Sequence, residues 1–231
     1  MSRILLSCVG GESGLKMARK EEAEKLITLS MHASNNIHRS LSSFYTYSFA
    51  KLRIDPKVLF DDIARSKVDD IASATPFQIC QILHSYSSLG KFDVDFFEEI
   101  ASRCGETLIK EGNSIDVANV LWSLTTANAL ERKGCVDLAT GLWRRVATNA
   151  NGEVDNMGVE SLVQCVQFFI SVRHRLEIEE PGEDLMRNMQ LAVLVQDASA
   201  SDGQRQLSEY LKEEVSALVR KLQAARAARL K

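Results

Sequence analysis

The sequence is poor in residues that interrupt helices, with only three Pro and 12 Gly among 231 positions. Many short strands need many turn residues, so this scarcity argues against an all-β sandwich and against a collagen-like chain. The five Cys are odd in number and form no C-x-x-C pair, so neither a disulfide framework nor a zinc knuckle is indicated. No run of about 18 apolar residues occurs, and the chain is not expected to span a membrane.

The charge also lacks an excess of either sign, because 28 Lys and Arg face 31 Asp and Glu, which gives a net charge of −3. With 45% apolar and 26% charged residues, the composition is that of an ordinary soluble domain. The length is sufficient to bury a core without disulfides. Nucleic-acid backbones are bound mainly through neutralised phosphates, and a net charge of −3 does not provide such neutralisation over the whole surface.

A short apolar pattern recurs along the chain at a nearly constant interval. The segment Ile79-Cys-Gln-Ile-Leu-His-Ser-Tyr86 returns 38 residues later as Val117-Ala-Asn-Val-Leu-Trp-Ser-Leu124. The template recurs 45 residues further on at Leu162, Cys165, Val166 and Phe169. It recurs more weakly 38 residues before the first segment, at Leu41, Phe44, Tyr45 and Ser48. Apolar residues spaced by three and four predict helices with one buried side.

A second helical pattern follows these first helices. Phe96-Phe-Glu-Glu-Ile-Ala101 resembles Leu59-Phe-Asp-Asp-Ile-Ala64, and Leu142-Trp-Arg-Arg-Val-Ala147 repeats the pattern with the charge reversed. Two dipeptides, Asp55-Pro56 and Thr75-Pro76, place a capping side chain before a proline that suits the first helical position. The remaining proline, Pro181, is expected to open the second helix of the fourth copy.

A two-helix unit of about 38 residues cannot cover its own apolar stripe, so each unit has to stack on its neighbours. The sequence therefore predicts an all-α protein, an α-solenoid of stacked helix-turn-helix repeats with a C-terminal basic helix. The segments are a leader and capping helix at 1–33, about four repeats at 34–198, a linker at 199–203 and an amphipathic helix with a basic tail at 204–231. In that helix Leu207, Leu211, Val215, Leu218 and Leu222 share the apolar side. The alternative fold is a single irregular helical bundle.

The polar side of the first helices recurs as regularly as the apolar side. Spacings of three or four residues place one amide or ring after another on a single surface column. The candidate residues are Gln81, His84, Asn119, Trp122, Gln164 and Gln167. Amides can pair with base edges and Trp or His can stack on bases, so this column suits modular RNA binding. The alternative is a solvated face on which Trp122 packs into the core against the next unit, and we favour the core position for Trp122.

Three basic clusters can supply contacts to phosphate. They are Arg144 with Arg145, Arg173 with Arg175, and a C-terminal group of Arg220, Lys221, Arg226 and Arg229. The alternative for the C-terminal group is a solvated helix end, where positive side chains complement the helix dipole.

No catalytic constellation is predicted, and no metal, cofactor or small-molecule substrate is expected. Cys80 and His84 are four residues apart on one predicted helix and could form a metal-binding or thiolate pair. A buried Cys beside a surface His is the favoured interpretation, because free Cys usually behaves as a small apolar residue.

The segments Ile79–Leu89 and Val117–Leu124, together with the Phe-Glu-Glu-Ile-Ala that follows the first, resemble octotricopeptide repeats and are equally similar to the shorter heptatricopeptide repeats of apicomplexan organelles. The resemblance covers roughly Ser34 to Val195. It implies stacked helix pairs, RNA as the ligand, a mitochondrial or plastid address, and a role in RNA maturation, translation or ribosome assembly.

Because the copies are few, the resemblance favours a non-enzymatic subunit of a larger particle over an independent RNA-binding protein. We expect a mitochondrial ribosome subunit in the matrix that contacts ribosomal RNA and neighbouring proteins. The alternative is a protein-only scaffold or accessory subunit of a mitochondrial membrane complex.

Overall fold

The computed structural model describes residues 25, 39–55, 57–66, 71–149, 152, 154–200 and 202–229. Within these ranges the regular structure consists of helices and contains no strand, so the prediction of an all-α protein is confirmed for them. The helices are α3 (Arg39–Leu52), α4 (Lys57–Ser66), α6 (Pro76–Ser88), α7 (Val94–Glu111), α8 (Ser114–Thr126), α9 (Lys133–Thr148), the 3-10 turn η1 (Val154–Asn156), α10 (Val159–Val172), α11 (Glu183–Ser199) and α12 (Asp202–Arg229). Apart from Lys25, the predicted leader and capping helix at 1–33 lies outside the described residues.

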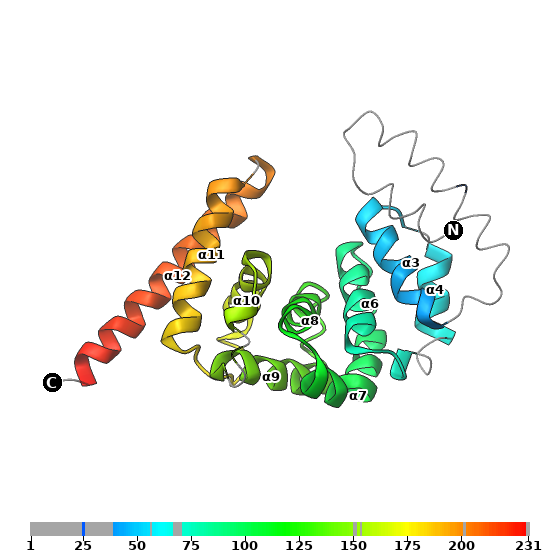
Figure 1. Cartoon of the computed structure of the whole chain (residues 1–231), viewed down its shortest axis with the longest axis horizontal. Coiled ribbons are helices and arrows are strands. Elements are labelled where there is room, and N and C mark those ends of the chain that lie inside the picture. Colours follow the sequence, from blue (N-terminus) through cyan, green and yellow to red (C-terminus); the bar gives the residue numbers. More distant parts are fainter. Residues whose placement is uncertain are drawn as a thin grey trace.

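The helices follow one another along a curved row with a concave and a convex side (Figure 1). We call α3, α6, α8, α10 and α11 the inner row, because each packs on the next and together they line the concave side. Helices α7 and α9 pack on each other along the convex side, and α12 packs on α11. Helices α3 and α12 therefore lie at opposite ends of the row.

The starts of the inner helices are encoded locally. The Thr75 hydroxyl accepts the N–H of Gln78, and the Gln78 side chain accepts the N–H of Thr75 at 3.0 Å, with Pro76 in the first turn. Asn113 and Asp116 form the same reciprocal box at the start of α8. These side chains satisfy N–H groups that have no partner within the helix, which explains why the boundaries could be predicted from the sequence.

Two predicted boundaries differ from the structure. Pro181 is buried and does not open α11, which begins at Glu183 after an extended Gly182. The predicted linker at 199–203 is shorter, because α11 runs to Ser199 and α12 begins at Asp202. The Ser199 hydroxyl donates to carbonyls of the preceding turn, and an acidic residue suits the first turn of a helix, so both ends extend into the expected linker. Pro56 lies outside the described residues.

Three inner helices end in the same way, with one residue in the left-handed region. These residues are Arg53 (φ 56°) after α3, Gly90 (φ 69°) after α6 and Asn128 (φ 52°) after α8. In each case the next residue donates its N–H to the carbonyl five positions earlier, at 2.8 to 3.1 Å, which is the Schellman arrangement. The spacing is 37 residues between the first two and 38 between the second pair.

This spacing corrects the register of the first copy. Its predicted apolar positions, Leu41, Phe44, Tyr45 and Ser48, assumed an interval of 38. With an interval of 37, Thr46 and Phe49 correspond to Leu83 and Tyr86. Thr46 and Phe49 are 0% and 3% exposed, and Leu83 and Tyr86 are 1% and 2% exposed. The connection between the first two copies is therefore one residue shorter than the sequence pattern indicated.

The residues of the recurring pattern form the core. Ile79, Val117 and Leu162, at equivalent positions of three inner helices, are all buried. Aromatic contacts join these helices to those behind them, as the Tyr86 hydroxyl of α6 donates to the Phe60 carbonyl of α4 at 2.6 Å.

The same kind of contact ties α9 to α10. The Trp143 ring stacks on Phe169 with centroids 5.1 Å apart, and its indole N–H donates to the Glu179 carbonyl at 2.7 Å. In α12 the predicted apolar side is buried at Leu211, Val215 and Leu218. The prediction for Leu207 is wrong, since Leu207 is 53% exposed near the start of α12 and the neighbouring Ser208, 3% exposed, is buried instead. The side chain of Leu222 lies outside the described residues.

Replacement of Trp143 by Ala tests the contact between α9 and α10. We expect the free energy of unfolding to fall by about 3 to 5 kcal/mol, because the variant loses a fully buried ring. The measurement is urea denaturation followed by circular dichroism. Leu191→Ala is the control, because Leu191 is 54% exposed and its loss should stay within about 0.5 kcal/mol. Equal stability of the Trp143 and Leu191 variants would contradict this account of the core.

Candidate functional site

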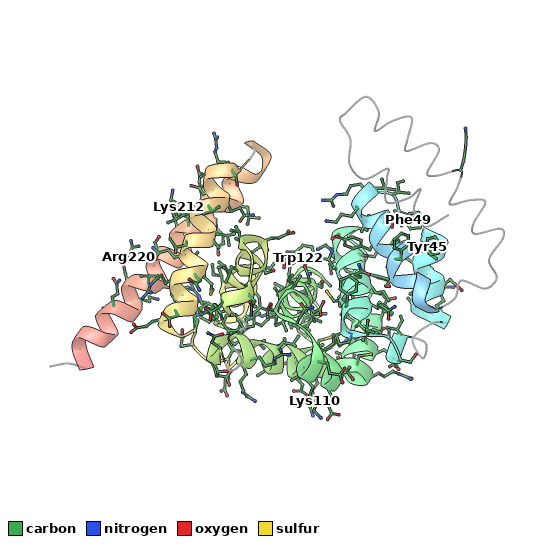
Figure 2. All side chains as sticks on the ribbon, viewed as in Figure 1. Tyr45, Phe49, Lys110, Trp122, Lys212 and Arg220 are labelled. Atoms are coloured by element: carbon green, nitrogen blue, oxygen red, sulfur yellow. The ribbon has the colours of Figure 1, made fainter. Side chains whose placement is uncertain are left out.

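The concave side carries two adjoining pockets of about 410 and 340 Å³. They share Tyr47, Lys51, His84, Glu160 and Gln164 as lining residues. We call their combined surface the concave groove, lined also by Ala50, Arg53, Phe77, Cys80, Gln81, Ser88, Ile115, Asp116, Asn119, Trp122, Ser161, Val163, Gln167 and Gln196. Every inner helix contributes to it, and Figure 2 shows Trp122 in the middle of the row, opposite Lys110 on the convex side.

The structure brings the six residues of the predicted column together in this groove. They are Gln81 and His84 of α6, Asn119 and Trp122 of α8, and Gln164 and Gln167 of α10. Their RNA-binding role stays a prediction, but their convergence from three successive helices is what the helical spacing implied.

Trp122 does not lie in the core position that we favoured from the sequence. Leu121 and Leu124 of the same helix are 0% exposed and fill the core, which turns the neighbouring Trp122 toward the groove. Its ring is half-buried and lies 5.0 Å from the His84 ring, centroid to centroid, at an angle of 34°. The two rings together form a partly open aromatic surface.

Two of the predicted amides contact each other across the groove floor. Gln164 Nε2 donates to Asn119 Oδ1 at 2.9 Å, and Gln164 is 6% exposed. This bond connects α8 and α10, so it holds the floor together as well as presenting polar atoms. Gln81 and Gln167 line one pocket each, toward opposite parts of the groove.

Cys80 is buried, and its surroundings disfavour the reactive thiolate form. Burial, and next the charge of Asp116, raise the pKa of the Cys80 thiol far above its ordinary value, so the thiol stays protonated at neutral pH. Burial likewise raises the pKa of Asp116, against the effect of the Asn113 N–H that it accepts. No three His, Cys, Asp or Glu side chains in the described parts of the chain gather in a way that could hold a metal ion.

The surroundings of His84 favour the neutral form of its ring. Burial lowers its pKa below the usual 6.5, and the positive charges of Lys51 and Arg53 lower it further, while Glu160 acts in the opposite direction. Lys51 and Arg53 are the Lys and Arg side chains that line the groove. Sequence reasoning missed Tyr47 and Lys51 because the register of the first copy was one residue off; a register of 37 aligns Tyr47 with His84 and Lys51 with Ser88. It missed Arg53 because this residue occupies a left-handed turn position where Gly or Asn is usual.

The basic clusters predicted from the sequence lie outside the groove. Arg144 donates to Glu179 at 2.6 Å, and Arg173 donates to Glu214 at 2.6 Å. Arg175 lies 4.0 Å from a carboxylate oxygen of Glu131.

Arg145 has a structural contact of its own. Its guanidinium donates to carbonyls at the C-terminal end of α7, including that of Gly112 at 2.9 Å. The C-terminal cluster lies on α12, where Arg220 and Lys221 are exposed at the far end of the row from α3 (Figure 2). The side chains of Arg226 and Arg229 lie outside the described residues.

Comparison with protein-family models, with curated proteins and with solved structures gave no match to this chain. None of the described helices combines the length and the apolar character needed to cross a membrane.

Titration of His84 tests the electrostatics of the groove. We expect a pKa below 6.5 by NMR of the imidazole ring, with His84→Gln used to assign the signal. Glu160→Gln should lower this pKa further, because it removes the one nearby charge that raises it. Since the unfolded chain binds this proton at higher pH than the folded one, stability should fall as pH decreases below 6.5, and His84→Gln should lose that part of the decrease. A pKa of His84 at or above 6.5 would contradict the effect of burial and of the nearby positive charges described above.

Proposed function

We propose that this protein is an α-solenoid of stacked helical hairpins that binds single-stranded RNA in the concave groove and acts without catalysis. The observation that carries the proposal is the convergence of the predicted column, one amide and one ring or amide from each of α6, α8 and α10, on one surface. The order in which the inner helices pack, each on the next, supports the stacked arrangement.

The chemistry of the groove suits unpaired bases. The Trp122 and His84 rings, tilted by 34° to each other, are partly exposed, and stacking on such rings contributes about 1 to 3 kcal/mol per base. Amide side chains from neighbouring helices lie on either side of the rings and can donate to or accept from base edges. Bases in an RNA duplex keep these edges inside the helix, so a pocket of about 410 Å³ favours a single strand.

The proposed setting is an organellar ribonucleoprotein, and specifically a mitochondrial ribosome, which rests on the octotricopeptide-like pattern. Exposed apolar side chains support contact with neighbouring proteins. Leu191, Leu194 and Val195 of α11 are 54%, 41% and 54% exposed, and such surfaces are usually covered by partners. The second candidate, a protein-only scaffold, would use the same α11 surface and leave the groove without RNA.

Trp122→Ala separates the two candidates. With fluorescently labelled single-stranded RNA, we expect salt-dependent binding by the wild-type protein and roughly 5- to 100-fold weaker binding by the variant, from the lost stacking. The free energy of unfolding should fall less than in Trp143→Ala, because Trp122 is only half-buried. Phe92→Ala is the matched control, since Phe92 is a 51% exposed aromatic residue that does not line the groove.

Two further measurements test the preference for single strands and the proposed setting in a ribosome. Duplex RNA of the same sequence should bind more weakly than the single strand. The tagged protein should sediment with ribosomal particles of the organelle and leave them after ribonuclease treatment. Absence of salt-dependent RNA retention, with sedimentation unchanged by ribonuclease, would support the scaffold instead.

A further inference from the structure

The charges in the concave groove are arranged on opposite walls. Lys51 and Arg53 belong to the wall made by α3 and its C-terminal turn, whereas Glu160 belongs to the first turn of α10. All three line one pocket, and the pKa of His84 between them responds to each. The groove is therefore positive along one side and negative along the other.

We infer that Lys51 and Arg53 form the phosphate-binding side of the groove and that Glu160 keeps phosphates away from α10, so that the bases of a bound single strand face α8 and α10. This inference rests on the proposed function and adds to it the direction in which the strand faces. Phosphate contacts fix the register and orientation of a nucleic acid, and base contacts select its sequence. Lys51 and Arg53 are thus the positioning residues, and the amides and rings are the sequence-selecting ones.

Arg53 occupies a backbone position that does not suit it. Its φ of 56° lies in the left-handed region, where the equivalent turns of α6 and α8 carry Gly90 and Asn128. Glycine takes this conformation without strain, whereas a residue with a long side chain does not. Arg53 Nη1 donates to the Ser88 carbonyl at 2.9 Å, which uses one of the five N–H donors of a guanidinium and holds the group at the groove. Strained residues of this kind concentrate at functional sites.

Lys51 is held beside Arg53 by an aromatic contact. Its Nζ lies 5.2 Å from the centroid of the Tyr47 ring, within the range of a cation–π interaction, and both side chains line both pockets. The basic residues that looked most favourable in the sequence are engaged elsewhere, with Arg144 and Arg173 bonded to carboxylates. The α3 wall is consequently where two cations lie next to the stacking rings.

Glu160 makes the opposite wall unsuitable for phosphate. It is exposed and lines both pockets, so a phosphate passing along α10 would meet a carboxylate. Asp116 of α8 lies deeper on the floor of the second pocket, buried. A strand whose backbone follows α3 avoids both acids and places its bases against Trp122 and the amides.

The test compares five proteins in titrations with labelled single-stranded RNA between 50 and 200 mM salt. They are the wild type, the double variant Lys51→Gln with Arg53→Gly, Glu160→Gln, Lys110→Gln, and the double variant Arg220→Gln with Lys221→Gln. The double variant should bind more weakly and should lower the slope of log affinity against log salt by about 1.4, from two lost phosphate contacts. Glu160→Gln should bind more tightly. Lys110→Gln removes one positive charge from the exposed convex side and should change neither value.

Folding is checked by the unfolding midpoint of the double variant, which should equal that of the wild type because glycine fits the turn. If it is lower, Arg53→Asn replaces Arg53→Gly, since Asn128 fills the equivalent turn of α8. The inference is overturned if the wild type binds RNA and the slope falls in Arg220→Gln with Lys221→Gln but not in the α3 variants; the proposed function then stands. Wild-type protein that retains no RNA at 50 mM salt overturns both.

Discussion

The packing of each inner helix against the next is the contact on which both the core and the groove depend. Ile79, Val117 and Leu162 are buried between successive helices, and their burial fixes the rotation of each helix about its own axis. Because side chains follow the 3.6-residue period, that rotation also decides which residues face the concave side. The amides and rings two and five residues further along each helix then reach the groove together. A substitution that rotates one helix would therefore change the groove without touching it.

Helices whose buried side is apolar could be predicted from the sequence. The register of α3 could not, because its buried side includes hydroxyl side chains. The buried side of α3 includes Ser42, Ser43 and Thr46, which an apolar pattern does not detect. Thr46 is tolerated there because its hydroxyl donates to the Ser42 carbonyl at 3.0 Å within the same helix. The result was a register one residue off in the first copy, and Tyr47 and Lys51 were missed for that reason. The stronger apolar patterns of α6, α8 and α10 placed Gln81, His84, Asn119, Gln164 and Gln167 on the concave side, whereas the core position favoured for Trp122 was wrong.

The charges of the groove were harder to predict, because the function of a basic side chain depends on residues far from it in the sequence. Arg145 reaches carbonyls more than 30 residues earlier, at the end of α7, and Arg173 reaches Glu214 41 residues later. Neither contact can be inferred from neighbouring residues. Lys51 lies in the last turn of α3, whereas Arg53 gains its position from the turn that follows. That turn was not recognised in the sequence, because Gly or Asn is its usual signal. Runs of positive charge in the sequence therefore did not identify the cations that line the groove.

The amide contact between Gln164 and Asn119 also sets the polarity of what the groove floor presents. Gln164 Nε2 donates to Asn119 Oδ1 at 2.9 Å, so the two amide groups are oriented relative to each other before a ligand binds. An amide that is already fixed loses little rotational entropy when a ligand binds, and it cannot rotate to exchange its donor and acceptor groups. This bond uses one of the two Nε2 protons of Gln164 and one lone pair of Asn119 Oδ1, so the remaining proton and lone pairs point in fixed directions. A chemical group that binds at this point must match those directions.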